Sequence, residues 1–428
     1  MTADVGRRTL VGRGRRGHHG PLRVGLIGGF GVGNLGNDAS LDAVIRLVRR
    51  IDPDVVVTCI CPQPEVVSRR FGIAAHSIRT RRPTSKLLST RVTRIPNRFG
   101  DAWRAQRITG SLDALLVPGT GILDDYGGEQ PTGWPLSLAL WFGAARLRGV
   151  RTGLVSIGAG PMAHPVSRRL ARLVGGWADY RSFRDAGSRN FMISTGLDVQ
   201  STEVAPDIVF SLPWPEPTQQ RQDRPLVAIP VMKYRGWYPN QQAGSIGERY
   251  TDALGAFCGW LLNEGYAVRL VTADAGDQPA TEAVARSVSS TNPELVRRWL
   301  TMAVAEDFDD LNRLLSDAAV VVATRYHSVI SALICGKPTL SVGYAAKNDE
   351  LMAAVGLGAY CQHIEHLDQD RLRRQFTDLM AHRRQLSLEV STRVSEFRGR
   401  LAGEEQWLAA CLGLAVSSDE NGHATKAA

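Results

Sequence analysis

The sequence predicts an α/β protein built from two doubly wound domains, each with a mostly parallel sheet. Its 428 residues are too many for one ordinary hydrophobic core and suit two domains. Short β-branched runs alternate with amphipathic helical stretches, which is typical of parallel sheets with helices between their strands. A polar, proline-containing stretch at residues 216–224 interrupts the alternation, which then resumes. We therefore expect an N-terminal domain over residues 21–215, a linker over 216–224 and a C-terminal domain over 225–365.

The N-terminal domain shows both patterns that a doubly wound sheet requires. Residues 41–50 place Leu41, Val44 and Val48 on one face, as expected for a helix that covers a sheet. The strands predicted for this domain are residues 22–27, 55–60, 114–117, 152–157 and 180–183. Open parallel sheets bind ligands beyond the carboxyl ends of their strands, so the loops that follow these runs are the candidate site.

The C-terminal domain repeats the pattern. Residues 319–323 form a continuous apolar run, which is typical of a strand buried on both faces. The strands predicted here are residues 226–232, 268–272, 319–323 and 339–342. Residues 366–415 are expected to form C-terminal helices, because Leu372, Phe376 and Leu379 fall on one helical stripe. A basic tail at 1–20 and a second tail at 416–428 are expected to be disordered.

The positive charge of the chain is concentrated in two segments. The net charge is +9; residues 1–20 carry +4 and residues 78–110 carry +8, so the remainder has −3. A slightly acidic body argues against nucleic-acid binding, for which basic residues would cover a folded face. The longest apolar stretch, residues 134–145, is too short to span a bilayer, and residues 1–20 lack the apolar core of a signal peptide. We therefore expect a cytoplasmic protein.

The sequence shows no pattern of a metal site or a disulfide framework. His363 and His366 stand in the sequence H-I-E-H, which lacks the spacing of zinc protease motifs. Cys59 and Cys61 are expected to point to opposite faces of a strand, and the other four cysteines are scattered. We therefore expect reduced thiols and assign no metal ligands, while a metal requirement stays open.

A glycine-rich loop follows the first predicted strand. Residues 31–36 match G-x-G-x-x-G, but the match starts three residues after the strand, and no acidic residue ends the second strand. A nicotinamide dinucleotide is therefore not expected. The loop residues of interest are Gly33, Asn34, Asn37 and Asp38. They fit either a loop that approaches an anionic or sugar ligand with its backbone amides, or a tight turn capped by Asn37 or Asp38.

Two more loops of the N-terminal domain carry candidate residues. The loop after residues 114–117 contains Gly119, Thr120, Gly121 and Asp124. Its close backbone approach, hydroxyl and carboxylate suit a polyhydroxylated ligand, although Asp124 is equally compatible with a solvated loop charge. Arg184 follows residues 180–183, and its forked donors can clamp a phosphate or carboxylate. The alternative for Arg184 is a structural ion pair with Asp185.

The most informative loop follows residues 319–323. Arg325, Tyr326 and His327 come directly after this strand, while Tyr344 and Lys347 follow the next one. Adjacent parallel strands would bring all five side chains to one edge of the sheet. An isolated histidine is most often structural, but one flanked by arginine at a strand end favours a functional site.

These motifs, in this order and spacing, resemble those of the polysaccharide pyruvyl transferase family over residues 22–360. The family has a G-x-x-G-x-x-N-x-G-[DN] opening, a glycine-rich loop before an acidic pair, R-[DE]-x-x-S, R-x-H, A-x-x-x-G-x-P and Y-x-x-K. The matching residues are Gly33, Asn34, Gly36, Asn37, Asp38, Gly119, Gly121, Asp124, Arg184, Asp185, Ser188, Arg325, His327, Ala332, Gly336, Pro338, Tyr344 and Lys347. Residues 204–207 also resemble a segment that ends the family's first domain.

The resemblance implies two Rossmann-like domains facing a cleft, as in GT-B glycosyltransferases. It implies a transferase that moves a pyruvyl group from phosphoenolpyruvate to sugar hydroxyls as a ketal, in the synthesis of a cell-surface glycan or its lipid-linked precursor. By this resemblance phosphoenolpyruvate would be the donor substrate, and no cofactor is expected. Arg184 and Arg325 would bind its charges across the cleft, with Lys347 as a further partner. His327 would act as general acid or as base for the hydroxyl, and Asp38 or Asp124 would orient the acceptor.

Two other functions remain open at this point. One is a GT-B-type glycosyltransferase with a nucleotide-sugar donor, which often needs a carboxylate for the ribose; near residues 336–347 only Glu350 offers one, on a later helix. The other is a non-catalytic protein that binds a sugar phosphate.

The basic segment 78–110 allows two interpretations. Its nine basic residues, with Phe99 and Trp103 among them, suit either a solvated loop or peripheral contact with anionic lipids at the inner face of the membrane.

Overall fold

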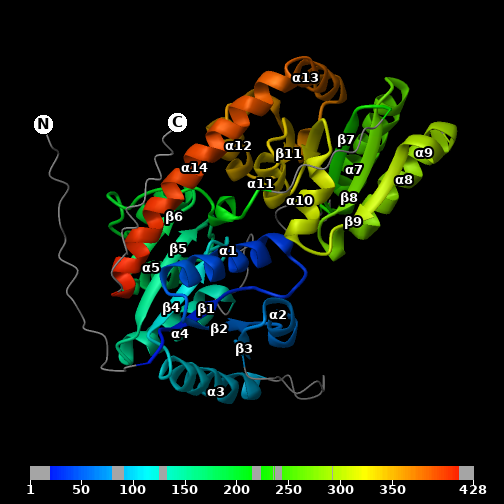
Figure 1. Ribbon diagram of the computed structural model, residues 1–428. Coiled ribbons are helices and arrows are strands. Elements are labelled where there is room, and N and C mark those ends of the chain that lie inside the picture. Colours follow the sequence, from blue (N-terminus) through cyan, green and yellow to red (C-terminus); the bar gives the residue numbers. More distant parts are fainter. Residues whose placement is uncertain are drawn as a thin grey trace, which may run out of the picture.

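The computed structural model describes residues 20–79, 91–124, 133–214, 223–234, 236, 243–291 and 293–413. Within them the chain forms two parallel six-stranded sheets flanked by helices (Figure 1). Several predicted segments lie wholly or largely outside the described residues: the basic tail 1–20, the linker 216–224, the tail 416–428 and part of the basic segment 78–110.

The first sheet has the strand order β3-β2-β1-β4-β5-β6, and all its pairs are parallel. Its strands are β1 (Arg23–Ile27), β2 (Val56–Cys61), β3 (Ala74–Ser77), β4 (Ala114–Pro118), β5 (Arg151–Ile157) and β6 (Tyr180–Phe183). Its helices are α1 (Leu35–Ile51), α2 (Pro64–Phe71), α3 (Arg91–Thr109), α4 (Trp134–Leu147), α5 (Pro165–Trp177) and α6 (Ala186–Ser194). Buried side chains of α4 and α5 pack in one core cluster and those of α1 in another, so helices cover both faces of this sheet.

The second sheet has the order β12-β11-β10-β7-β8-β9 and is also parallel. Its strands are β7 (Leu226–Val231), β8 (Ala267–Thr272), β9 (Leu300–Val304), β10 (Val320–Ala323), β11 (Thr339–Gly343) and β12 (Cys361–His363). Its α-helices are α7 (Ala243–Asn263), α8 (Gln278–Thr291), α9 (Pro293–Trp299), α10 (Phe308–Ser316), α11 (Tyr326–Ile334) and α12 (Ala346–Ala354). Short 3-10 turns occur at η2 (Ile208–Ser211), η3 (Ala275–Asp277), η4 (Gly358–Tyr360) and η5 (Ile364–His366).

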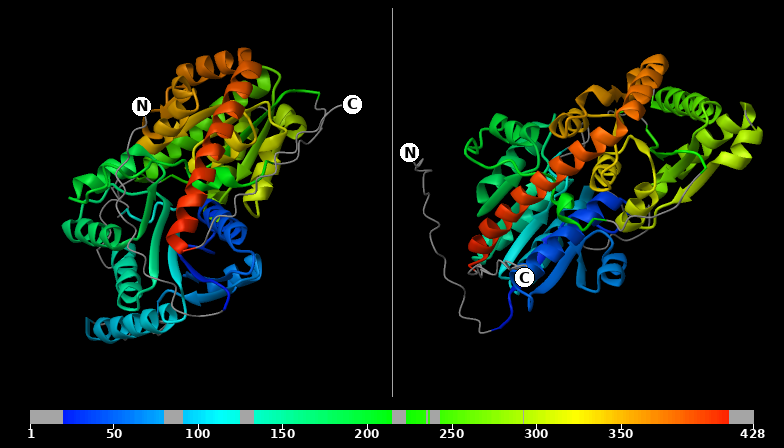
Figure 2. Two further views of the ribbon diagram at one scale, coloured as in Figure 1. Left: turned by 60° about the vertical axis from the view of Figure 1, so that its left-hand side comes forward. Right: turned by 45° about the horizontal axis from the view of Figure 1, so that its top comes forward.

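Two C-terminal helices, α13 (Gln369–Ala381) and α14 (Arg383–Leu412), follow the second sheet. The long helix α14 crosses from the second sheet back to the first (Figures 1 and 2). There the guanidinium of Arg398 donates to the carbonyl oxygen of Phe210 at 2.9 Å, and Arg50 pairs with Glu405 at 2.9 Å. One core cluster includes buried residues of both sheets, α1, η2 and α14. The two halves are therefore held in a fixed relation around the site.

All nine strands predicted from the sequence are present, and each end differs by at most one residue. The strands that the sequence pattern missed are β3, β9 and β12, which are edge strands of their sheets. Edge strands are partly exposed, and the alternating or exposed residues of β3 and β9 give no continuous apolar run. The predicted helix at 41–50 is the C-terminal part of α1, which begins earlier, at Leu35.

The longest apolar stretch of the sequence forms α4, whose side chains are largely buried against the first sheet. Among the described residues, no helix has the length and apolar character needed to cross a membrane.

Candidate active site

A cavity of about 310 Å³ lies between the two sheets, at the carboxyl ends of their strands. Residues after β1, β4 and β6 line one side, and residues after β7, β8, β10 and β11 line the other. We call it the central cavity. The sequence-predicted residues that line it are Asn34, Asn37, Gly121, Asp124, Arg184, Arg325, Tyr326, His327, Tyr344 and Lys347. Both sheets therefore direct their strand ends at one space, as open parallel sheets commonly do.

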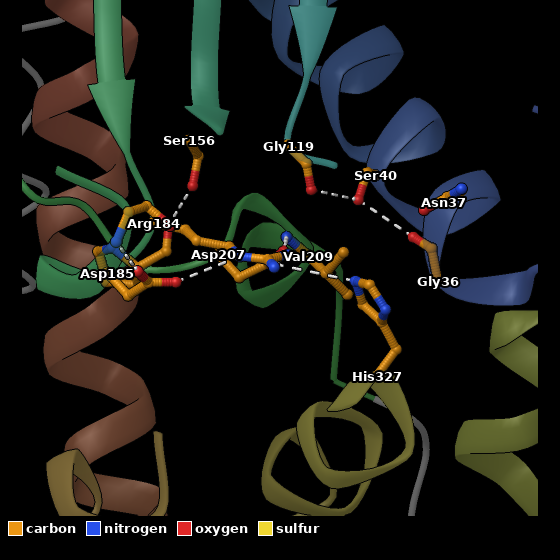
Figure 3. Close-up of polar contacts among 12 residues, drawn as sticks. Gly36, Asn37, Ser40, Gly119, Ser156, Arg184, Asp185, Asp207, Val209 and His327 are labelled. Atoms are coloured by element: carbon orange, nitrogen blue, oxygen red, sulfur yellow. Dashed lines mark hydrogen bonds and ion pairs between the residues drawn. The ribbon is translucent and has the colours of Figure 1, made fainter. Parts of the chain in front are cut away.

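Arg184 stands at the end of β6 with its side chain buried in the interface between the sheets. Its Nη1 atom lies 3.2 Å from Oδ2 of Asp207, and its Nε atom lies 3.4 Å from Oδ2 of Asp185 (Figure 3). The guanidinium also lies 4.7 Å from the ring centroid of Tyr326, in a cation–π contact from the other sheet. Arg184 thus makes the structural ion pair considered as an alternative, and it lines the cavity as well.

His327 lies in the first turn of α11 and joins the two halves of the site. Its Nε2 atom lies 3.8 Å from Oδ2 of Asp207, which belongs to the segment after the first sheet (Figure 3). The ring packs on Gly36 of α1 so closely that a Cβ atom at Gly36 would lie 2.0 Å from Nδ1 of His327. Only glycine at position 36 permits this approach of the two domains.

The electrostatic surroundings keep His327 uncharged. Burial holds the pKa of His327 well below its usual range, and the nearby Arg184, Lys347 and Arg325 cations lower it further. Burial raises the pKa of Asp207, while Arg184 opposes that effect. Nε2 of His327 has no hydrogen-bond partner among the described residues. A neutral imidazole beside a buried carboxylate can accept a proton, and that carboxylate can stabilise the resulting imidazolium.

Arg325, at the N-cap of α11, is held by two carboxylates that follow β8. Its guanidinium donates to both carboxylate oxygens of Asp277, with Nη2 at 2.7 Å from Oδ1, and lies 3.5 Å from Oδ2 of Asp274. Asp274 also forms an isolated β-bridge with Asn34 of the glycine-rich loop. The pairing fixes Arg325 at the cavity wall, and the carboxylate of Asp277 offsets part of its positive charge.

Tyr344 and Lys347 come from the loop after β11 and the start of α12. The ammonium of Lys347 lies 5.4 Å from the ring centroid of Tyr326 and 5.2 Å from that of Tyr344. These aromatic faces orient the lysine at the cavity wall.

The structure divides the predicted residues of the glycine-rich loop. The N-cap of α1 is Asn34, which accepts a hydrogen bond from the Asn37 amide at 3.1 Å, so the prediction of Asn37 or Asp38 as the capping residue is wrong; Asn34 and Asn37 both line the cavity. Asp38 turns away from it, because its buried carboxylate accepts from the Gly31 amide at 2.9 Å and from Arg70 at 3.1 Å. Gly33, with a φ of 86°, provides the turn and does not line the central cavity.

The second glycine-rich loop is divided in the same way. The Gly119 carbonyl accepts from Ser40 at 3.0 Å, and a Cβ at Gly119 would lie 2.6 Å from Ile208, so this residue serves the packing of α1 (Figure 3). Thr120 is buried behind the loop. Gly121 and Asp124 face the central cavity. Of the two carboxylates proposed to orient an acceptor, the structure therefore brings only Asp124 to this space.

Several residues of the site are not predicted from the sequence. Lys233 and Tyr234 follow β7, and Asp274 follows β8, so the strand-end rule applied to these two strands would have found them. Asp207 lies in the segment 204–207. This segment resembles one of the family, but the resemblance assigns no role to the Asp207 carboxylate. Ser156, at a φ of 51°, donates its hydroxyl to the Pro206 carbonyl at 2.5 Å and so fixes the backbone next to Asp207.

Comparison with protein families gives a match to the polysaccharide pyruvyl transferase model over residues 34–345. The match covers most of the chain, from Asn34 in the glycine-rich loop after β1 to the loop after β11, and includes Arg325 and His327. The chain belongs to the polysaccharide pyruvyl transferase family. The family resemblance inferred from the sequence motifs is thereby confirmed. A comparison with curated proteins gives no match.

The fold of this pyruvyl transferase family member is shared with sugar-processing enzymes of the GT-B type. A putative UDP-N-acetylglucosamine 2-epimerase from Listeria monocytogenes is 13% identical, with a TM-score of 0.59 over 91% of this chain and 97% of that one. The Neisseria meningitidis UDP-GlcNAc 2-epimerase bound to UDP-GlcNAc is 12% identical (TM-score 0.56; 89% and 100% covered). A glycosyltransferase from Rickettsia africae is 8% identical (TM-score 0.55; 92% and 98% covered). At these identities the likeness establishes the two-domain Rossmann-like fold alone.

The low pKa of His327 predicts how the stability of this family member depends on pH. In the unfolded chain the histidine binds a proton near pH 6.5, whereas in the folded chain it stays neutral to lower pH. The unfolded state therefore binds more protons below about pH 6.5, and the free energy of unfolding falls there by up to about 1.4 kcal/mol per pH unit from this group. Urea unfolding at pH 7, 6 and 5 should show a smaller loss for His327→Gln than for the wild type. Equal losses in the two proteins would contradict the assignment.

Proposed function

We propose that this protein transfers a pyruvyl group from phosphoenolpyruvate to hydroxyls of a glycan, or of its lipid-linked precursor, with release of phosphate. The observation that supports the proposal most is the convergence of cations from both domains on one cavity that also holds a neutral histidine. Arg184, Lys233, Arg325 and Lys347 line the central cavity, against the carboxylates of Asp124 and Asp274. Asp207 and Asp277 pair with two of these cations from behind the cavity wall, so their N–H donors are fixed in position, and fixed cationic donors suit a ligand with a phosphate and a carboxylate.

The cations are held at the cavity wall in different ways. Arg184 and Arg325 are each held by buried carboxylates, Asp207 and Asp277, so they supply oriented N–H donors in fixed positions. Lys347 lies against the faces of two tyrosine rings, and it adds charge at the same wall. We assign the phosphate and carboxylate of the donor to this set of residues.

The reaction requires a group that moves protons at neutral pH. Carbon C3 of phosphoenolpyruvate takes up one proton, and two sugar oxygens form bonds to C2 as the bond from C2 to the phosphate oxygen breaks. The two hydroxyl protons are thereby accounted for, one on C3 and one on the released phosphate. Because His327 is neutral in the free protein, we assign it the role of base for an attacking hydroxyl, with Asp207 positioned to stabilise the imidazolium.

Binding distinguishes this proposal from a nucleotide-sugar glycosyltransferase. A ligand at one hundred times its Kd raises the free energy of unfolding by about 2.7 kcal/mol. Phosphoenolpyruvate should stabilise the wild type, and Lys347→Gln should weaken its binding at least tenfold. Arg393→Gln, which removes an exposed cation on α14, should leave the affinity unchanged. Stabilisation by UDP-N-acetylglucosamine without any by phosphoenolpyruvate would contradict the proposal.

We further propose peripheral contact with an anionic membrane through α3, which forms most of the described part of the basic segment 78–110. This helix carries five arginines against Asp101. The side chains of Phe99 and Trp103 are 74% and 64% exposed one helical turn apart, and Arg107 lies 5.6 Å from the Trp103 ring. Exposed aromatics beside arginines suit a lipid headgroup layer, where each basic residue contributes about 1 kcal/mol.

Vesicle sedimentation tests this contact. The wild type should bind vesicles that contain phosphatidylglycerol and not those of phosphatidylcholine alone. Phe99→Ser with Trp103→Ser should abolish that binding, whereas Trp407→Ser, at a tryptophan of 63% exposure on α14, should not. Equal binding by the two variants would show that α3 is not the contact.

A further inference from the structure

A second cavity of about 260 Å³ adjoins the central cavity. Gly121, Asp124, Arg184 and Lys347 line both, so the two spaces meet at these residues. We call the second space the side cavity. Its remaining wall consists of the backbone at residues 158–161, the start of α6 and the start of α12. Residues of both domains therefore form its wall.

The two cavities differ in charge. Apart from the residues they share, the central cavity adds Lys233 and Arg325 against Asp274. The side cavity adds the carboxylates of Asp185 and Glu350, and the shared Arg184 and Lys347 are the only basic residues among its described lining residues. A doubly or triply negative donor is accordingly favoured in the central cavity and disfavoured in the side cavity.

The groups that line the side cavity suit the hydroxyls of an uncharged sugar. Glu350 reaches across from α12, where the Gly187 amide of α6 donates to it, and burial raises the pKa of its carboxyl. Asp185 is partly engaged, because its Oδ1 atom caps α6 by accepting from the Ser188 amide at 2.6 Å. The wall also includes the ring of Phe191 and the glycines Gly158 and Gly160. Carboxylates accept hydrogen bonds from hydroxyls, while the ring and the glycine backbone allow close apolar approach.

We propose that the side cavity binds the acceptor as an uncharged hexose unit, held by Glu350 and Asp124. This inference rests on the proposed function, since it places the reacting hydroxyls where the two cavities meet. Asp124 lines both spaces, so its carboxylate faces the hydroxyls on one side and the donor on the other. Because three carboxylates face two cations in this cavity, an acceptor unit with its own negative charge is disfavoured relative to an uncharged one.

The test measures acceptor binding apart from turnover. Saturation-transfer NMR with p-nitrophenyl glycosides of galactose, glucose and mannose, and with p-nitrophenyl glucuronide, gives the affinity of each probe without the donor. At least one neutral hexoside should bind, and the glucuronide should bind at least tenfold more weakly. Glu350→Gln should weaken the neutral probe about tenfold and reduce its advantage over the glucuronide, because a hydrogen bond to a charged group is lost. Asp349→Asn, at the neighbouring exposed carboxylate of α12, should change neither.

The outcomes separate this inference from the proposed function. If phosphoenolpyruvate binds but Glu350→Gln and Asp349→Asn give the same hexoside affinity, the acceptor does not occupy the side cavity, although the donor assignment stands. Failure of every neutral hexoside to bind, or equal binding of the glucuronide, would also overturn the inference. If phosphoenolpyruvate fails to bind, the proposed function falls whatever the hexosides do. Asp124→Asn provides a second variant, with the same expected loss of hexoside affinity.

Discussion

Replacement of His327 by alanine is expected to lower the rate of pyruvyl transfer by about 10²–10⁴-fold, the usual contribution of a positioned general base. His327 is the neutral titratable side chain at the junction of Asp207, Gly36 and the central cavity. The loss should appear in kcat, because the cations that bind the donor remain. The affinity for phosphoenolpyruvate, measured by calorimetry, should change by only a few-fold.

A more conservative variant separates chemistry from packing. His327→Gln fills a similar volume but supplies no group that titrates near neutral pH, so it should lose as much activity as the alanine variant. A glutamine variant with near-normal kcat would show that the ring packs the domain interface and does not move a proton.

Gly36→Ala is expected to have a comparably large effect although it adds a single methyl group. In an ordinary helix this change would stabilise the protein by up to about 1 kcal/mol. Here the new Cβ would lie 2.0 Å from Nδ1 of His327, so the ring or the domain must move. A displacement of about 1 Å at a catalytic group costs about 10²-fold in rate, and overpacking costs about 1–3 kcal/mol in stability.

Two further variants make this prediction specific. Gly399→Ala, at an exposed glycine of α14 with no atom within 4 Å of the new Cβ, should leave the activity unchanged. The double variant Gly36→Ala with His327→Ala should recover much of the lost stability, because the ring is gone, without recovering activity. If Gly36→Ala is as active as Gly399→Ala, the close contact between α1 and His327 does not govern the reaction.

The sequence was sufficient to predict the central strands of both sheets and the edge strand β6, since most of these are short apolar runs between helical stretches. The edge strands β3, β9 and β12 could not be predicted in the same way, because a half-exposed strand lacks that run. The strand-end rule also points to His327, Arg325 and Arg184, because each of them closely follows a strand that the residue pattern makes recognisable.

Features that depend on how the two domains approach each other were not readable from the sequence. Asp207 lies after a bridge of Val204 to β6, far in sequence from His327, and nothing local marks it as a partner. From the sequence, Gly36 looks like an ordinary glycine of a turn. The structure shows that a side chain is not tolerated there because the ring of His327, from the other domain, occupies the space that a Cβ would take. The sequence also left Asp38 and Asp124 equivalent; the structure separates them because Arg70 and the Gly31 amide hold Asp38 away from the cavity.

Acceptor-dependent release of inorganic phosphate from phosphoenolpyruvate is the most direct test that the central cavity carries out pyruvyl transfer. With purified wild type and a panel of neutral hexosides, we predict that phosphate is released only when an acceptor is present. Mass spectrometry should show one pyruvyl ketal on the acceptor for each phosphate, and His327→Ala should abolish both signals. Consumption of UDP-N-acetylglucosamine by the same protein, with no phosphate released from phosphoenolpyruvate, would contradict the assignment.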